Sequence, residues 1–139
     1  IDKDPLAPPY EKSLHVCDLT NYGLNATNYA VLLNKFPATK NHFLLIPHEF
    51  AKQSDPLTED DLSLTYQIIR NFRTRLIAFF NCGEESGASQ KHKHVQFFSL
   101  SENEPPIDVY LKGQNIYDQA SQLIQVPWAH FLISIQPHE

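Results

Sequence analysis

The chain has 139 residues, of which 42% are hydrophobic and 12% aromatic, and its formal net charge is -5. This length and composition predict one globular domain, alone or with an appendage, and exclude a wholly disordered chain. The acidic balance argues against a broad nucleic-acid or lipid-headgroup surface, because such surfaces need clustered Lys and Arg. The sequence contains no run of about 18 apolar residues, so we expect no membrane-spanning helix.

The cysteine content predicts free thiols. Cys17 and Cys82 are too few for a disulfide framework and lack a Cys-x-x-Cys spacing. We therefore expect a reducing compartment, the cytoplasm. The chain has no methionine, opens at Ile1 and stops at Glu139 after an apolar stretch, so we expect it to be part of a longer protein.

The first third of the chain predicts an arm followed by a pair of strands. Residues 1–12 carry three of the prolines and predict an extended arm, and the polar residues 21–28 predict a loop. Two β-like runs follow, at residues 29–34 and 42–47, on either side of a turn at Pro37. An antiparallel pair is the simplest interpretation of these runs.

Apolar residues at intervals of three or four predict one long helix over residues 58–80. Thr58 suits the N-cap, and the acidic residues 59–61 suit the positive end of the helix dipole. The predicted buried stripe consists of Leu62, Tyr66, Ile69, Phe72, Leu76 and Phe80.

The segment after this helix uses glycine where glycine is otherwise scarce. Two of the four glycines, Gly83 and Gly87, lie within residues 81–90, which predicts backbone that turns tightly or approaches a ligand closely. Alternation then predicts a strand over residues 91–98. We place a domain boundary after residue 100.

The remainder, residues 101–139, is expected to be the truncated start of a C-terminal region. It predicts a short helix over residues 115–125 and a strand over residues 131–136. We expect Trp128, Phe131 and Ile133 to be core residues of this region.

The alternation of the strand at 91–98 places His92, His94 and Gln96 on one face and Lys93 on the other. Burying three unpartnered polar side chains would cost a few kcal/mol each, so this face is expected to line a cleft. The preceding loop brings backbone N–H groups and the Ser89 hydroxyl to the same end of the strand. Imidazoles, an amide and these donors together predict an anion site, with phosphate as the expected anion.

Two other interpretations of the histidine pair stay open. A His-x-His pair on a strand has the spacing of two zinc ligands, with His42 or Asp108 as a third. The pair could also be two surface histidines on an edge strand, but that interpretation leaves the adjacent Gly-x-Ser-Gln turn unexplained.

The motif His92-Lys-His94-Val-Gln96-Phe-Phe resembles the His-x-His-x-Gln signature of the nucleotidyl-transferase branch of the histidine-triad superfamily. Residues 86–94, with 33–37 and 41–47, are similar to fungal-type diadenosine tetraphosphate phosphorylases, also called ATP adenylyltransferases. The arm at residues 4–10 resembles the segment that precedes them there. Galactose-1-phosphate uridylyltransferases share the short motif, but nothing around it is as similar. The resemblance implies an α+β fold with an antiparallel sheet and one main packed helix.

The resemblance also implies roles for individual residues. His94 matches the nucleophile, with His92 and Gln96 as its partners in the motif. The implied substrate-binding residues are Asn34 at the ribose, Lys35 at a phosphate, His42 near the nucleotide, Asn81, Gly87 and Ser89 at the phosphates, and Gln90.

The chemistry of these residue types agrees with a transfer reaction. A neutral imidazole is a good nucleophile near pH 7. If one ring nitrogen of His94 donates to a backbone carbonyl, the other can attack phosphorus and form a phosphoramidate. Ser89, the loop N–H groups and His92 or Gln96 would then stabilise the phosphate oxygens. An amide such as that of Gln96 cannot protonate a leaving group, which favours transfer between phosphates over hydrolysis of an amine-type bond.

The expected reaction is phosphorolysis of diadenosine tetraphosphate to ATP and ADP through a covalent His94-AMP intermediate. The expected partners are a dinucleoside polyphosphate, AMP, ADP, ATP and phosphate, with no nucleic acid or membrane, and the expected state is a monomer. No cofactor is required by the histidine chemistry, although magnesium could accompany the substrate phosphates. Lys40, Lys91 and Lys93 could offset substrate charge. A histidine-triad hydrolase and a non-catalytic nucleotide-binding remnant are the alternatives.

Overall fold

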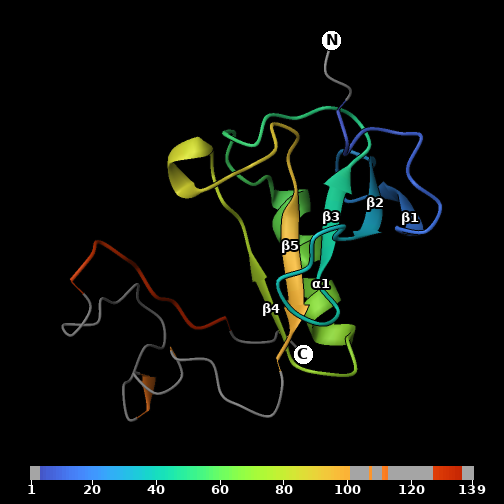
Figure 1. Cartoon of the computed structure of the whole chain (residues 1–139). Coiled ribbons are helices and arrows are strands. Elements are labelled where there is room, and N and C mark those ends of the chain that lie inside the picture. The colour runs from blue at the N-terminus through green and yellow to red at the C-terminus, as the bar shows by residue number, and fades with distance from the viewer. Residues whose placement is uncertain (1–3, 101–106, 108–110, 113–126, 136–139) are drawn as a thin grey trace. The chain divides into compact units, whose positions relative to one another are not determined.

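The computed structural model describes residues 4–100, 107, 111–112 and 127–135 (Figure 1). The chain divides into two compact units, Ile1–Leu100 and Ser101–Glu139. The elements of the first unit are β1 (His15–Tyr22), β2 (Thr27–Leu33), β3 (Phe43–Pro47), α1 (Glu59–Asn71), β4 (Leu76–Phe79), the short 3-10 turn η1 (Glu84–Ser86) and β5 (Val95–Ser99).

The strands form one five-stranded sheet in the order β1-β2-β3-β5-β4, and every neighbouring pair is antiparallel. The pair predicted for residues 29–34 and 42–47 is confirmed, because β2 and β3 pair in register from Tyr29↔Pro47 to Leu33↔Phe43. β3 and β5 lie side by side at the centre of the sheet (Figure 1). The α+β architecture is therefore as predicted.

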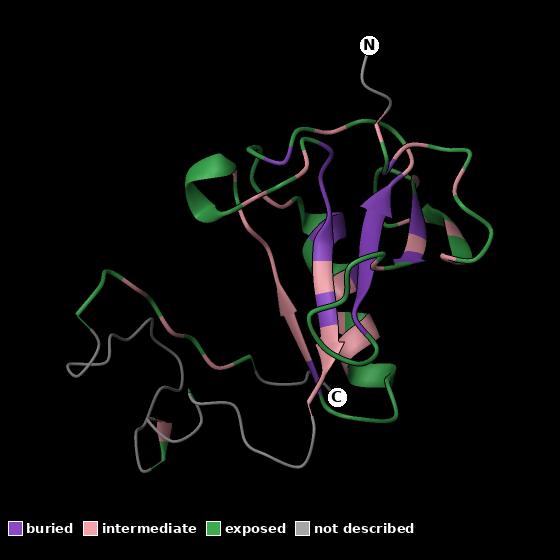
Figure 2. Cartoon of the chain, viewed as in Figure 1, coloured by how far each residue is buried: buried purple, intermediate pink, exposed green. Residues whose placement is uncertain are grey.

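Each face of the sheet is covered by a different segment. The face toward α1 carries a core of Tyr29, Phe43, Leu45, Leu64, Leu76, Val95 and Phe97. The opposite face carries a second cluster of Leu6, Ala30, Leu32, Leu44 and Ile46, in which Leu6 comes from the N-terminal arm. Figure 2 shows β3 buried along its whole length, as a strand covered on both faces must be. The arm therefore covers the face of the sheet opposite α1.

The arm contains turns rather than the continuous extended chain that its prolines predict. Asp4 to Pro9 bend back over the sheet, and the backbone N–H of Ala7 donates to the carbonyl of Asp4 at 3.3 Å. Leu6 is 8% exposed, so burial of its side chain against β2 and β3 is what holds the arm down.

The predicted start of the helix is confirmed. Thr58 is the N-cap of α1, and its side chain accepts from the backbone N–H of Asp61 while the Asp61 carboxylate accepts from the N–H of Thr58. This reciprocal capping box satisfies two backbone donors that the helix itself cannot pair.

The predicted end of the helix is wrong. α1 stops at Asn71, and residues 76–79 form β4, which pairs with β5. The apolar residues at 72, 76 and 80 continue a helical spacing by coincidence, whereas the long-range pairing with β5 decides the strand. Within α1 the stripe is also shifted, because Leu64 is buried and Leu62 is 55% exposed.

Two strands differ from the sequence-based expectation. β1 was not predicted, because it is an edge strand with mostly exposed residues and shows no apolar alternation. β5 begins at Val95 rather than at residue 91, and an isolated bridge between Lys52 and His92 takes the place of the earlier pairing. The chain there is extended but only partly paired.

The described residues of the second unit bear on some of the predictions for residues 101–139. The predicted helix at 115–125 lies outside the described residues. Of the predicted strand at 131–136, the described residues 131–135 contain only a bridge residue at Leu132. Trp128, Phe131 and Ile133 are exposed, so the prediction that they are core residues is wrong. No helix in the described part of the chain is long and apolar enough to cross a membrane.

Candidate active site

A cavity of about 510 Å³ lies between the N-terminal arm and the arm-facing side of the sheet. This volume is within the ordinary range for small-molecule sites. Seven of the residues predicted from the sequence line it together: Asn34, Lys35, Gly87, Ser89, Gln90, His94 and Gln96. Segments separated by up to about 60 positions in the chain therefore meet at one site.

His94 has the hydrogen bond that a nucleophilic imidazole requires. Its Nδ1 lies 2.8 Å from the backbone carbonyl oxygen of His92, an atom that can only accept. Nδ1 therefore donates, and in the neutral ring Nε2 is left with the lone pair. The side chain is 5% exposed yet lines the cavity, so this lone pair is sheltered from bulk water.

Burial also sets the charge of this ring. Desolvation lowers the pKa of His94 below its ordinary value of 6.5, and the neighbouring His92 and His42 lower it further, against the opposing hydrogen bond to the His92 carbonyl. The neutral, nucleophilic form is therefore the stable one near pH 7.

This lowered pKa predicts a loss of stability in acid. The unfolded chain takes up a proton at His94 more readily than the folded chain, so this contribution is complete above about pH 6.5 and is lost as the pH falls through the folded pKa. We expect the free energy of unfolding to fall more between about pH 7.5 and pH 5.5 in the wild type than in His94→Asn. Urea unfolding of both proteins at the two pH values measures this difference. Equal losses of unfolding free energy in the two proteins would contradict the lowered pKa of His94.

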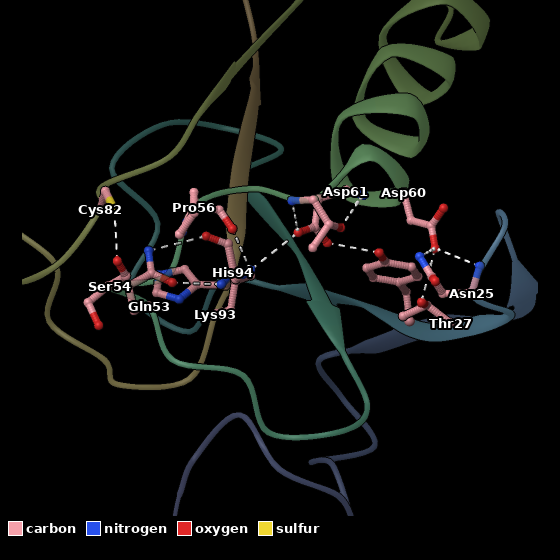
Figure 3. A network of polar contacts seen from close by, with 12 residues as sticks. Asn25, Thr27, Gln53, Ser54, Pro56, Asp60, Asp61, Cys82, Lys93 and His94 are labelled. Atoms are coloured by element: carbon pink, nitrogen blue, oxygen red, sulfur yellow. Dashed lines mark hydrogen bonds and ion pairs between the residues drawn. The ribbon is translucent and has the colours of Figure 1, made fainter.

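Gln53 holds the backbone of His94 in place, a role that the sequence did not reveal. Its Oε1 accepts from the His94 N–H at 2.8 Å, and its Nε2 donates to the carbonyls of His94 at 3.5 Å and Asn81 at 2.7 Å. The side chain is 2% exposed, and Figure 3 shows it beside His94. The Gln53 amide thus pairs with the backbone N–H and C=O of His94, as a neighbouring strand would, just before β5 begins.

His42 does not line the cavity, but it orients Gln96, which does. Its Nδ1 accepts from the backbone N–H of Ala38 at 3.3 Å, so Nε2 carries the proton and donates to Gln96 Oε1 at 3.0 Å. The Asn34 amide lies 3.2 Å from the same ring. With its oxygen engaged, Gln96 directs its amide NH2 away from His42, as a donor to a ligand requires.

The glycine-containing loop makes the tight turn that its composition predicts. Gly83 and Gly87 have positive φ values of 83° and 84°, a region that favours glycine. The N–H groups of Ser86 and Ala88 donate to the carbonyl of Gly83, and that of Gly87 donates to the carbonyl of Glu84. These three N–H groups are used within the turn. The prediction that the loop offers its backbone N–H groups to an anion is therefore wrong for these three.

Three further predicted residues lie near this turn. Ser89 and Gln90 line the cavity directly. Asn81 does not line it, but a Cβ at Gly87 would lie 3.9 Å from Asn81 Nδ2, so the Asn81 side chain borders the turn. Asn81 therefore lies beside the turn at Gly87, outside the lining of the cavity.

The structure places His92 behind the cavity rather than in its wall. The residue is 1% exposed, its Nδ1 lies 2.8 Å from Asp4 Oδ2, and its Nε2 lies 2.9 Å from the carbonyl oxygen of Pro47. The predicted stabilisation of phosphate oxygens by this ring does not fit, because both nitrogens already face oxygens. The contribution visible in the structure is the carbonyl that orients His94.

Of two predicted cations, Lys93 differs from expectation and Lys35 does not. Lys93 is 4% exposed and turns toward α1, where its Nζ donates to the Pro56 carbonyl at 2.8 Å and lies 3.4 Å from Asp61 Oδ2 (Figure 3). It cannot offset the charge of a ligand on the opposite face. Lys35 does line the cavity, and its Nζ lies 3.3 Å from Glu11 Oε2.

The zinc interpretation is not supported within the described residues. There, no group of three or more His, Cys, Asp or Glu side chains is arranged to hold a metal ion. Asp108, one of the suggested third ligands, lies outside those residues. His42, the other, directs its ring to Gln96 and Asn34 instead.

The antiparallel sheet with one packed helix, together with a His-x-His-x-Gln motif whose middle histidine lines a cavity, defines the chain as a member of the histidine-triad superfamily. The family model described as the Ap4A phosphorylase N-terminal domain matches residues 2–112. Because this match covers most of the chain, the chain belongs to that family.

The relatives that the chain resembles include two proteins of Saccharomyces cerevisiae. Diadenosine 5',5'''-P1,P4-tetraphosphate phosphorylase 2 is 33% identical over 148 aligned positions, covering 96% of this chain and 44% of the relative. Protein APA1 is 34% identical over 105 positions, covering 72% of this chain and 32% of the relative. The chain thus spans less than half the length of either relative.

Solved structures give the same picture. The crystal structure of yeast Ap4A phosphorylase Apa2 in complex with AMP is similar with a TM-score of 0.76 and 35% identity, covering 92% of this chain and 45% of that one. Apa2 in complex with Ap4A is similar with a TM-score of 0.75 and 31% identity, covering 94% and 48%.

Proposed function

We propose that this chain carries the nucleotidyl-transfer site of a diadenosine tetraphosphate phosphorylase, which converts diadenosine tetraphosphate and phosphate into ATP and ADP. The observation that carries the proposal is the state of His94, a buried ring that donates from Nδ1 and lines a cavity with Ser89 and Gln96. The similarity to yeast Apa2, which has been crystallised with AMP and with Ap4A, supports the choice of substrate.

The first step is attack of His94 Nε2 on the phosphorus that bears the first adenosine. An N–P bond forms, the P–O bond to the next phosphate breaks, and ATP leaves with the bonding electrons as an anion. The terminal phosphate of ATP is stable without a proton. The departing ATP therefore needs no proton from the enzyme. Gln96, whose amide cannot donate a proton to a leaving group, is compatible with this step.

The second step returns the histidine to its starting state. A phosphate oxygen attacks the adenylate phosphorus, the N–P bond breaks, and ADP is released with the neutral ring restored. We assign the stabilisation of charge on the phosphate oxygens in both steps to the hydroxyl of Ser89 and the amide of Gln96, both of which line the cavity. Asn34 is assigned to the ribose and Lys35 to a phosphate, on the same cavity wall.

The remaining expectations belong to the same proposal. The histidine chemistry needs no cofactor held by the chain, and magnesium would enter bound to the substrate phosphates. Cys17 and Cys82 are free, exposed thiols in the structure, which is compatible with the cytoplasm as the expected compartment. The expected state of the protein remains a monomer.

Trapping the intermediate tests the proposal. The chain is mixed with diadenosine tetraphosphate labelled in the adenine, without phosphate, and quenched at short times. We expect label on the protein in up to one equivalent, located on His94 by peptide mapping, and released as ADP when phosphate is added. Label on another residue would reject the assignment of His94. Binding of AMP by titration with no adduct would instead support the nucleotide-binding remnant.

A further inference from the structure

The N-terminal arm is part of the cavity rather than a tail beside it. Asp4, Pro5, Leu6, Ala7, Pro9 and Glu11 all line it. The side chain of Leu6 is buried in the cluster formed by β2 and β3, which anchors the centre of the arm. A ligand in the cavity would therefore lie between the arm and the sheet.

One carboxylate connects this arm to the motif strand. Asp4 Oδ1 accepts from the backbone N–H of Leu6 at 2.9 Å, which shapes the turn of the arm. Asp4 Oδ2 accepts from His92 Nδ1 at 2.8 Å, across 88 positions of sequence. The two oxygens thus have separate tasks, one within the arm and one on the motif.

Two further contacts hold the His92 ring in addition to that with Asp4. Its Nε2 donates to the Pro47 carbonyl at 2.9 Å, and the Phe50 ring packs edge-on against it with a centroid distance of 5.3 Å. The two ring nitrogens face a carboxylate oxygen and a peptide carbonyl oxygen, so we expect each nitrogen to donate. Its peptide carbonyl accepts from His94 Nδ1 at 2.8 Å, so the same residue whose ring is held by Asp4 also orients the His94 ring through its backbone.

We propose that Asp4 is a positioning residue, which latches the N-terminal arm onto His92 and thereby sets both the wall of the cavity and the orientation of His94. The proposal rests on the proposed function for the role of His94. It predicts that one contact supports two properties, the affinity for the nucleotide and the rate at which His94 is adenylated.

Three variants separate geometry from charge. Asp4→Ala removes the latch, and we expect adenylation of His94 to slow ~10- to 100-fold and the Kd for AMP to rise, since small displacements of a reacting group cost factors of this size. Asp4→Asn keeps the length: its oxygen can accept from the Leu6 N–H while its NH2 donates to a His92 ring that retains only the Nε2 proton. Asp4→Glu keeps the charge but is one methylene longer.

A positioning role requires Asp4→Asn to recover most of the lost rate and affinity and to exceed Asp4→Glu in both. The matched control is Asp55→Ala, since Asp55 is exposed and also precedes a proline. Asp4→Ala kinetics equal to those of Asp55→Ala would overturn the proposal. A rate for Asp4→Glu above that of Asp4→Asn would overturn it too, because charge would then outweigh placement. If Asp4→Ala does not fold, the comparison of the other two variants decides.

A spectroscopic measurement tests the latch without any turnover. NMR of the imidazole nitrogens should show a proton on both nitrogens of His92 in the wild type and on Nε2 alone in Asp4→Asn. An unprotonated Nδ1 in the wild type would overturn the latch. If the wild type formed no adduct, the proposed function would fail, whereas the NMR signal and AMP titration would still report on Asp4.

Discussion

Replacing His94 by Asn is expected to abolish turnover of diadenosine tetraphosphate, with a loss of at least ~10³-fold, because no other group supplies the attacking nitrogen. Asn is the informative replacement, since its side-chain amide can still donate to the His92 carbonyl as Nδ1 does. The fold around position 94 should therefore survive while the nucleophile is lost. Steady-state phosphorolysis and the yield of covalent adduct measure the effect.

The matched control is His15→Asn, which removes a histidine on β1 that pairs with Asp18 and does not line the cavity. We expect it to leave both the rate and the adduct yield unchanged. His94→Asn should still bind AMP, because the cavity wall remains. Turnover of His94→Asn at the wild-type rate would eliminate the covalent mechanism and favour direct transfer or hydrolysis.

Replacing Asp61 by Ala is expected to cost ~3–5 kcal/mol of stability, the largest structural effect in the first unit, because it leaves a buried charge unpaired. Asp61 lies 3.4 Å from Lys93 Nζ (Figure 3). It also accepts from the Tyr29 hydroxyl at 2.8 Å and completes the capping box of α1. The side chains of the ion pair are only 6% and 5% exposed. Urea unfolding at neutral pH measures the loss.

Removing both charges should cost much less than the two single changes together. In Asp61→Leu with Lys93→Met, neither charge is left buried alone, and apolar side chains replace the ion pair between the segment before β5 and α1. Asp55→Ala, which removes an exposed carboxylate from the loop before α1, is the control and should stay within about 0.5 kcal/mol of the wild type. A double variant as unstable as the sum of its parts would show that the two residues act independently.

The substitutions at His94 and Lys93 test opposite faces of one extended segment. Odd-numbered residues of the motif, Lys93 and Val95, face α1 and its core, whereas His94 and Gln96 face the cavity. Alternation was therefore the part of the site most open to prediction, because it depends only on the extended backbone. The tight turn at Gly83 and Gly87 was predictable for the same local reason.

The contacts that hold the motif were not predictable. Gln53 lies 41 positions before His94 and Asp4 lies 88 positions before His92. A lone glutamine in a loop and a lone aspartate in an arm carry no periodic signal. An Asp before a proline does suggest a turn, but nothing in it identifies the partner of the second carboxylate oxygen.

Local sequence was sufficient to predict which side of the motif Lys93 and His94 face, the β2–β3 pair and the cap of α1, since each follows from backbone period or from hydrogen bonds within a few residues. Packing between distant segments decided the rest. It turned residues 76–79 into a strand, paired Lys93 with Asp61, and closed the arm over the sheet. The reason is physical: the free energy of these choices comes from partners that are neighbours only after the chain has folded.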